Sequence, residues 1–431
     1  MNKKHILIST SILILLASIL ACSVPVKTVP TATSVPDEGG SGPATTIEPT
    51  VTLTEPPELP PPAVATLRVV YIKGDNVWVW TEGTGSSQLT TAGDASTSVL
   101  SGDGQEIAFI RSGELWAINA DGSNERQLVS AVFLSTLATA GNTAEVNDLV
   151  WKPGSHTIYF NSLVVAGEAG YRIPHFDLFS SNADAGADAV ATQENPGSGG
   201  VPYFSPDGTV VALVQPDKII FMEVTGAFWN VGLTFQNVLM YSEGMYVPEV
   251  VWLPDSTGLR TVIPASDPLG DPTEVTTVWN VPVSGTATVL DTFVAVPAFA
   301  SAPVLSPDGS QVLYLAASGS DNVIHVRQVG GLDNDYTSAA AGQIGIVNWS
   351  PDSTHFVYWL PQLSNTYFGA VGEITSSVSD ISPDANAVRW IDSSLLIYIT
   401  DSGELRYRPV DGVSSLIDSN VSEYDFGWVI Y

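Results

Sequence analysis

Positive charge and cysteine are both scarce in this sequence. Its 431 residues include 15 lysines and arginines against 45 aspartates and glutamates, which gives a formal net charge of -30. A surface this acidic repels phosphate backbones, so the composition argues against a nucleic-acid partner and favours solubility in an external medium. The sequence has one cysteine, Cys22, which excludes an intrachain disulfide.

Catalytic signatures are also missing. No Gly-x-Ser-x-Gly elbow occurs, and the histidines after residue 22 are too scattered to indicate a metal set or a catalytic triad. Two acidic pairs, Asp333 with Asp335 and Asp184 with Asp188, lie among Asn, Asp and Gly residues that are typical of turns. Solvated turns are the interpretation that we favour for them, with a calcium site as the alternative. We therefore expect no catalytic residue, metal or cofactor.

The first 22 residues have the composition of an export signal. Lys3 and Lys4 precede an apolar stretch from residue 6 to 21, which is short for a membrane span and typical of a signal-peptide core. The stretch ends in Ile-Leu-Ala-Cys, which resembles the bacterial lipobox, although Ile19 stands where leucine is preferred. The resemblance implies that residues 1–21 are removed and that Cys22 carries a lipid, anchoring the chain to a bacterial cell or outer membrane, outside the cytoplasm. An uncleaved anchor and an ordinary secretory signal are the alternatives.

Residues 22–66 differ sharply from the rest of the chain. They are rich in Pro, Thr, Val, Ser and Glu, and they hold ten of the 29 prolines. Such a segment cannot build a packed core, so we interpret it as an extended, disordered tether. The folded part is then expected to be a single domain over residues 67–431.

That region contains a repeat. Its clearest copies begin Phe-Ser-Pro-Asp-Gly at residue 204, Leu-Ser-Pro-Asp-Gly at 305 and Trp-Ser-Pro-Asp-Ser at 349. In each, Ser-Pro-Asp followed by Gly or Ser supplies a type I turn between two β-rich runs. The turn aspartates, to which we assign a structural role, are Asp103, Asp207, Asp255, Asp308 and Asp352.

The spacing of the repeat predicts the architecture. Large apolar residues lead the copies at positions 100, 151, 204, 252, 305, 349, 390 and 428, with a mean spacing of about 47 residues, as in four-stranded propeller blades. No helical periodicity competes over any long window. The sequence therefore predicts an all-β, eight-bladed β-propeller of four-stranded antiparallel blades, with seven blades as the alternative. Residues 426–431 supply the strand that the first blade lacks, which closes the ring.

The Ser-Pro-Asp-Gly unit with its following Asp-Gly hairpin resembles the WD40-like repeat of TolB propellers, and is similar to propellers of prolyl oligopeptidase-type peptidases. The resemblance covers nearly all of residues 67–431. It implies the fold, but not the function, because propellers host binding, catalysis and scaffolding alike. TolB has an additional α/β domain before its propeller, where this chain has the proline-rich segment, and this departure argues against a simple TolB role.

Turn lengths predict two different faces. The short Ser-Pro-Asp-Gly and Asp-Gly turns share one end of the blades, whereas the long, irregular connections share the other, including residues 130–145, 164–175 and 237–248. Binding residues concentrate on such variable loops. The candidate ligand-binding residues on this long-loop face are Tyr171, Arg172, His175, Phe176, Tyr241, Met245 and Tyr246. Packing of these side chains against the propeller is the alternative interpretation.

Three functions fit these observations. The first is a monomeric, non-catalytic binding module that recognises an extracytoplasmic protein or glycan through the long-loop face. The second is a surface hydrolase or lyase acting on glycan or peptide, which predicts carboxylates around the central channel. The third is a TolB-like component of an envelope complex. The first is the hypothesis that we favour.

Overall fold

The computed structural model describes residues 65–138, 141–167, 170–226, 229–240, 244–360, 365–370 and 379–430. All of them belong to the compact unit Pro62–Tyr431. The predicted signal, Cys22 and all but the last two residues of the predicted tether lie outside the described residues. Within the described part, no helix is long and apolar enough to span a bilayer.

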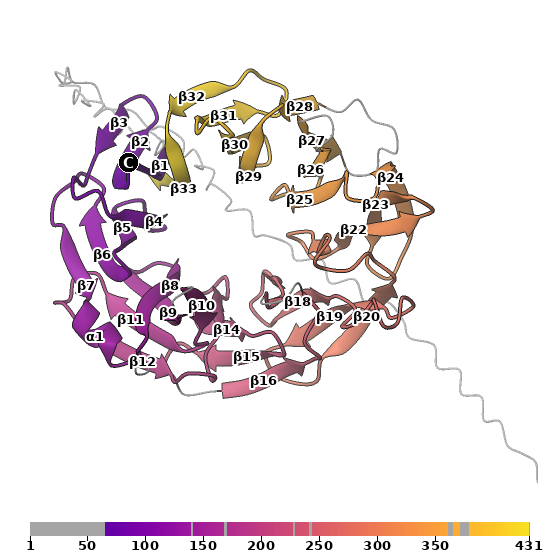
Figure 1. The fold of residues 1–431 in the computed structure, drawn as a ribbon, viewed down its shortest axis with the longest axis horizontal. Helices are drawn as coiled ribbons and strands as arrows, with labels where there is room; N and C mark the ends of the chain where they lie inside the picture. Colours follow the sequence, from indigo (N-terminus) through magenta and orange to yellow (C-terminus); the bar gives the residue numbers. More distant parts are fainter. Residues whose placement is uncertain are drawn as a thin grey trace, which may run out of the picture. The chain divides into compact units, whose positions relative to one another are not determined.

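The described strands form eight antiparallel sheets, numbered here as blades 1 to 8 (Figure 1). Blade 1 is β33 (Val421–Ile430), β1 (Ala65–Lys73), β2 (Asn76–Thr81) and β3 (Gly85–Gln88). Blade 2 is β4 (Ala95–Leu100), β5 (Glu106–Arg111), β6 (Glu114–Asn119) and β7 (Arg126–Val129). Blade 3 is β8 (Thr143–Trp151), β9 (Thr157–Ala166), β10 (Tyr171–Pro174), β11 (Leu178–Asn182) and β12 (Val190–Glu194). Blade 4 is β13 (Val201–Phe204), β14 (Val210–Val214), β15 (Lys218–Glu223) and β16 (Trp229–Thr234).

Blades 5 to 8 repeat the pattern. Blade 5 is β17 (Val250–Trp252), β18 (Gly258–Ile263), β19 (Thr276–Pro282) and β20 (Thr288–Phe293). Blade 6 is β21 (Val304–Leu305), β22 (Gln311–Ser318), β23 (Asp321–Gln328) and β24 (Asp333–Ala340). Blade 7 is β25 (Gly345–Trp349), β26 (His355–Leu360), β27 (Asn365–Ala370) and β28 (Ser379–Ser382). Blade 8 is β29 (Ala385–Asp392), β30 (Leu395–Thr400), β31 (Leu405–Pro409) and β32 (Ser415–Asp418). One short helix, α1 (Ala131–Ser135), lies between blades 2 and 3.

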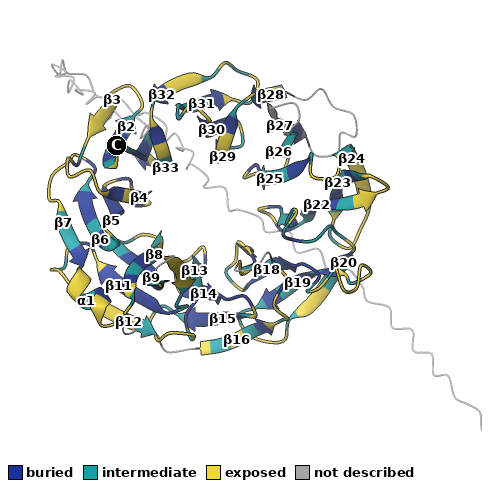
Figure 2. Ribbon diagram, viewed as in Figure 1, coloured by how far each residue is buried: buried dark blue, intermediate teal, exposed yellow. Residues whose placement is uncertain are grey.

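Alternation of side chains along the strands explains why the sheets stack. On β1, Leu67, Val69 and Tyr71 pack against blade 8, whereas Val70 and Ile72 pack against blade 2. Successive residues of a strand point to opposite faces, so one buried strand supplies two interfaces. Eight such apolar clusters occur among the described residues, each spanning two neighbouring blades. Figure 2 shows this buried material in the middle strands, with exposed residues along the outer strands. The prediction of eight blades is confirmed.

The two ends of the folded chain close the ring. Strand β33 pairs antiparallel with β1, placing Leu67 opposite Trp428 and Val69 opposite Phe426. Asp418 reinforces the junction, because its carboxylate accepts a hydrogen bond from the Tyr71 hydroxyl at 2.7 Å and lies 2.6 Å from Lys73 Nζ. The predicted closure is therefore confirmed. Trp428 itself is 38% exposed, so this last repeat residue is less buried than expected for a core tryptophan.

The repeat residues hold neighbouring blades together. In the turn at residue 205, the Ser205 hydroxyl donates to Asp207 Oδ1 at 2.6 Å and accepts from the backbone N–H of Val210 at 3.0 Å. The backbone N–H of Asp207 in turn donates to the hydroxyl of Ser256, which lies in the corresponding turn of the next blade. Three of the repeat tryptophans donate their indole N–H to a backbone carbonyl of the preceding blade. The acceptor is the residue just before the repeat position of that blade. The pairs are Trp151 with Val99, Trp252 with Tyr203 and Trp349 with Val304.

Removing the closing strand tests this architecture. A chain that ends at Asn420 lacks β33, which leaves the paired edge of β1 open and removes Val421 and Tyr424 from the cluster between blades 1 and 8. We expect this chain to lose cooperative unfolding in guanidinium chloride, whereas a control chain ending at Ile430 keeps it. An unchanged unfolding midpoint and slope in the chain ending at Asn420 would contradict closure by β33.

Candidate functional site

Among the described residues, blade 3 alone has a fifth strand, which forms part of an extension of its sheet. The second half of β9 pairs on one side with residues 143–147 of β8 and on the other side with β10. The turn to β10 begins at Gly167 and ends at Gly170, both with positive φ angles that favour glycine. We call residues 143–147, 161–166 and 171–174 the blade 3 extension. It lies on the long-loop face, where the sequence predicted an irregular loop. Part of that loop is the strand β10 instead, because the run Leu163-Val164-Val165 favours sheet.

A buried polar cluster fixes the base of the extension. The carboxylate of Asp177, which is fully buried, accepts hydrogen bonds from the Ser162 backbone N–H at 2.7 Å and from the Ser162 hydroxyl at 2.6 Å. The same hydroxyl lies 2.9 Å from Nδ1 of His175. Burial raises the pKa of Asp177, and the hydrogen bonds from Ser162 partly offset this effect. Such satisfied, buried networks rigidify the elements that they join.

This Ser-His-Asp cluster is not a catalytic triad. In a triad the serine and the acid contact different nitrogens of the imidazole ring. Here Ser162 Oγ and Asp177 Oδ2 both approach Nδ1 of His175, at 2.9 and 3.6 Å, and Ser162 is fully buried. His175 and the half-buried Phe176 therefore lie at the base of the extension rather than at its rim, and they position it.

A cavity of about 560 Å³ lies beside the extension, at the inner edge of blades 1, 2 and 3. Arg172 on β10 lines it, and its guanidinium forms an ion pair with Glu145 on β8 at 2.7 Å. Tyr171 and Ile173 flank Arg172 and therefore point to the opposite side of β10, where they are 51% and 49% exposed. The extension thus presents one charged side and one apolar side.

Two further carboxylates line the cavity. Asp148 lies in a bulge of β8 with a positive φ of 41°, and its Oδ2 accepts a hydrogen bond from Asn161 Nδ2 at 2.8 Å. Glu423 comes from β33, on blade 1. The surrounding protein raises the pKa of both groups, chiefly by desolvation, although Asp148 is open to the water of the cavity. Strain and carboxylates with raised pKa values in one concave site are features of functional sites.

The other predicted residues lie elsewhere on the long-loop face. Met245 and Tyr246 belong to the connection between blades 4 and 5, and Tyr241 lies outside the described residues. Tyr246 packs against the apolar cluster of these two blades and lines a small cavity of about 130 Å³, where burial raises its pKa. Met245 is 49% exposed. The structure therefore separates this group from Tyr171 and Arg172.

The interpretation of Asp333 and Asp335 as turn residues was wrong. Both lie on strand β24, and each has a carboxylate oxygen 3.2 Å from Nδ1 of His325 on the neighbouring β23. The Tyr314 hydroxyl also donates to Asp333, and Arg327 pairs with Asp291 across the interface between blades 5 and 6. The Arg327–Asp291 pair joins two blades, whereas the contacts of Asp333 and Asp335 with His325 and Tyr314 lie within blade 6. Within the described part of the chain, no group of His, Cys, Asp or Glu has the arrangement of a metal site.

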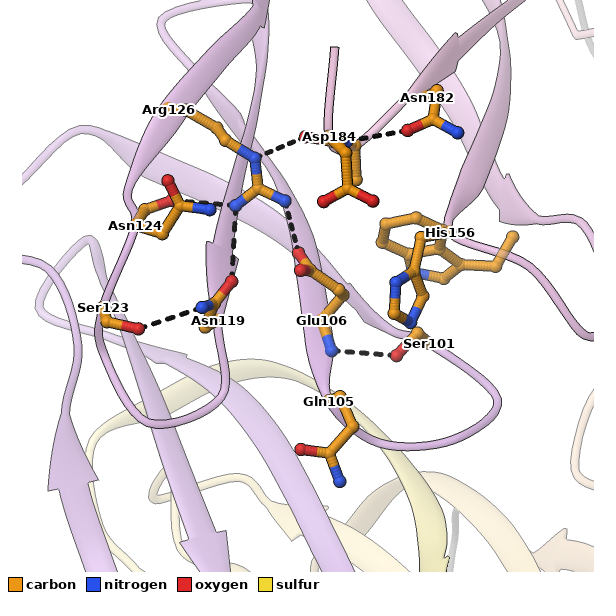
Figure 3. A network of polar contacts seen from close by, with 12 residues as sticks. Ser101, Gln105, Glu106, Asn119, Ser123, Asn124, Arg126, His156, Asn182 and Asp184 are labelled. Carbon is orange, nitrogen blue, oxygen red and sulfur yellow. Dashed lines mark hydrogen bonds and ion pairs between the residues drawn. The ribbon is translucent and has the colours of Figure 1, made fainter.

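The short-turn face is occupied by contacts between blades. Figure 3 shows Arg126, which forms an ion pair with Glu106 at 2.7 Å and donates to the backbone carbonyl of Ala183 in blade 3. A second link joins Nε2 of His156 to Asp103 at 3.0 Å. A cavity of about 530 Å³ lies between these two turns. The polar groups of these two links thus have partners in the neighbouring blade.

Comparison with known proteins adds little beyond the fold. No model of a protein family matches the sequence, and no curated protein sequence matches it. Solved structures that match include the Dos1 propeller, with a TM-score of 0.49, 13% identity, and coverage of 81% of this chain and 87% of that one. A structure of the eukaryotic initiation factor matches with a TM-score of 0.48 and 9% identity, covering 84% and 98%. TolB from Acinetobacter baumannii matches with a TM-score of 0.33 and 12% identity, covering 68% and 73%. The chain's own strand order establishes the propeller.

Neutralising carboxylates at the two faces should change the free energy of unfolding in opposite directions. The folded-state pKa values of Asp148 and Glu423 are raised, so their ionised forms oppose folding at neutral pH and cease to do so once pH falls below their unfolded values near 4. We expect the double variant Asp148→Asn, Glu423→Gln to be at least as stable as the wild type at pH 7, with the difference vanishing below about pH 4.

Asp207 provides the control of opposite sign. Hydrogen bonds from Ser205 and Thr209 lower its pKa to about 2, so its contribution to stability is present above its unfolded pKa and is lost as pH falls toward 2. The Asp207→Asn variant should therefore be less stable than the wild type at pH 7. Guanidinium unfolding of all three chains from pH 2.5 to 7 measures both effects. If the double variant Asp148→Asn, Glu423→Gln is clearly less stable than the wild type at pH 7, these two carboxylates stabilise the fold and the prediction is wrong.

Proposed function

We propose that this chain is a monomeric, lipid-anchored binding protein outside the cytoplasm, whose propeller recognises a protein or glycan through its long-loop face. The observation that carries the proposal is the cavity beside the blade 3 extension, which residues of three blades line and where charged groups from blades 1 and 3 converge on a preformed concave site. The fixed base of the extension favours recognition, because a rigid site loses little conformational entropy on binding.

The position of the chain ends supports this use of the face. Ala65 pairs with Ile430 at the end of blade 1 that is opposite the β1–β2 connection, and Arg68 donates to the carbonyl of Gly104 in a repeat turn at 2.5 Å. The segment before Ala65 is therefore joined at the short-turn face. The proposed binding face is thus at the opposite end of the blades from the point where this segment is attached.

The amino-terminal segment supplies the proposed anchor and spacer. Residues 1–21 act as the signal, Cys22 carries the lipid, and residues 22–66 form the tether to the propeller at 67–431. Acyl chains contribute about 0.8 kcal/mol per buried methylene group, enough for several chains to hold a soluble domain on a bilayer. In polyproline II form, at about 3.1 Å per residue, the tether reaches on the order of 100 Å.

Lipidation is tested by Cys22→Ser in a bacterial host supplied with an alkyne-labelled fatty acid. The wild-type chain should take up label and partition into the membrane and detergent phase, whereas the variant should lose both. Internal labelling at another site cannot mimic this result, since the sequence has no second cysteine. Equal labelling of both chains would contradict a lipid on Cys22.

Recognition through the long-loop face is tested with a photo-crosslinking amino acid placed at Tyr171 and, as a control, at Val413. Val413 lies in the β31–β32 turn on the opposite face and is 87% exposed, so it is at least as accessible as Tyr171. We expect discrete, saturable adducts on intact cells from position 171 only. Adducts from position 413 alone, or equally from both, would contradict the proposal.

A surface hydrolase or lyase is the second candidate, because Asp148 and Glu423 are carboxylates with raised pKa values at the channel edge, as general acids often are. Purified chain incubated with glycan and peptide libraries separates the two functions. Turnover that Asp148→Asn abolishes, in a chain that remains folded, would replace binding with catalysis.

A further inference from the structure

The cavity beside the blade 3 extension has an unbalanced charge. Among the described residues that line it, Glu145, Asp148 and Glu423 are acidic and Arg172 is the one basic residue. Arg172 already forms an ion pair with Glu145 at 2.7 Å. Arg389 acts on Glu423 from outside this lining, but it is itself paired with Asp425 at 3.1 Å. An anionic ligand would meet these carboxylates and would have to compete with Glu145 for the guanidinium. The site therefore favours a positively charged group.

The rest of the protein offers few internal cations for this role. Most guanidinium groups of the described residues are held by carboxylates or by backbone carbonyls, as with Arg327 on Asp291 and Arg260 on the carbonyl of Gly309. Across the whole sequence, acidic residues outnumber basic ones by 45 to 15. A cation for the cavity is thus expected from a partner, and long-range attraction would speed the encounter.

The rim of the cavity indicates what carries that cation. Tyr171 and Ile173 leave about half of their surface in water, on the strand whose other side lines the cavity. Tyrosine and aliphatic side chains next to a desolvated charge are typical of the centre of protein interfaces. The volume of about 560 Å³ exceeds what a bare metal ion needs, and admits a long side chain with part of its backbone.

We infer that the cavity receives a lysine or arginine side chain of a partner protein, whose neighbouring apolar residues contact Tyr171 and Ile173. This inference rests on the proposed recognition through the long-loop face, and it specifies the chemistry of the ligand. Asp148 and Glu423 bind the cationic head, and the Arg172–Glu145 pair closes one wall. The cluster of Ser162, His175 and Asp177 holds β10 in place before binding.

The test uses the full chain, immobilised in detergent, and a phage-displayed library of random heptapeptides as the probe. Enriched peptides should contain lysine or arginine beside an aromatic or aliphatic residue. A synthetic peptide of this kind is then compared with its analogue in which norleucine replaces the basic residue. Replacing the basic residue with norleucine should weaken the binding of the peptide to the wild type at least tenfold. It should weaken binding to the double variant Asp148→Asn, Glu423→Gln less than threefold, because in a double-mutant cycle the two changes remove the same interaction.

A matched variant controls for net charge. Glu82→Gln with Asp411→Asn removes the same two charges from exposed turns on the short-turn face, and it should bind the lysine peptide as the wild type does. The variant Tyr171→Ala, Ile173→Ala should weaken both peptides alike. Circular dichroism and the unfolding midpoint of each variant establish that the compared chains are folded.

The alternative outcomes are distinct. Peptides that need Tyr171 and Ile173 but bind equally well without their basic residue would overturn this inference and leave the proposed function standing. Peptides whose binding is unchanged by every long-loop substitution, or no enriched peptide at all, would overturn both. Spermidine that binds the wild type as tightly as the peptide, and loses affinity in the cavity variant, would identify a small polyamine as the ligand and exclude the protein partner.

Discussion

The pairing of β33 with β1 is the constraint on which the rest of this structure depends. Each blade buries one face against the blade before it and the other against the blade after it, so the sheets have no free face only when the ring is complete. Closure joins residues about 360 positions apart in the sequence, Leu67 and Trp428 among them. It also fixes Glu423, on the closing strand, at the cavity shared with blades 2 and 3.

The two faces of the ring have different physical roles for a related reason. Short turns place serine, aspartate and tryptophan at the same position in successive blades, so that polar groups of one blade meet those of the next. Because the spacing is regular, these turn residues form hydrogen bonds between neighbouring blades. The long connections have no such regularity, and at their end of the blades Asp148 on β8 and Glu423 on β33 line a cavity. Ionised carboxylates with raised pKa values destabilise the fold at neutral pH. Such a cost is common where residues serve function rather than stability.

The sequence predicted the fold closely because its information is local and repeated. The turn at Ser205-Pro206-Asp207-Gly208 and the tryptophan spacing are read directly from the chain, and repetition gives blade number and closure. The site was predicted only in part. Arg172 was found because it lies on a long connection, whereas Glu145, Asp148 and Glu423 were missed. The first two lie on the inner strand β8, and Glu423 on β33 meets them only when the ring closes. Asp333 and Asp335 were wrongly interpreted as turn residues. Their local composition is typical of a turn, but backbone pairing with β23 places them in a strand.

The blade 3 extension shows how one repeat can be enlarged without disturbing its neighbours. Residues 157–160 of β9 pair with β11 as in an ordinary blade, while residues 163–166 pair with β10 beyond it. The change from one partner to the other occurs at Ser162, where the buried Asp177 binds both the backbone N–H and the hydroxyl. An insertion held at its base in this way leaves the interfaces between blades intact: Ala144 and Val146 of the extension themselves join the apolar cluster with blade 2, and the residues that face blade 4 lie outside the extension. Variation can then be confined to the rim, which is what a rigid scaffold with changeable specificity requires.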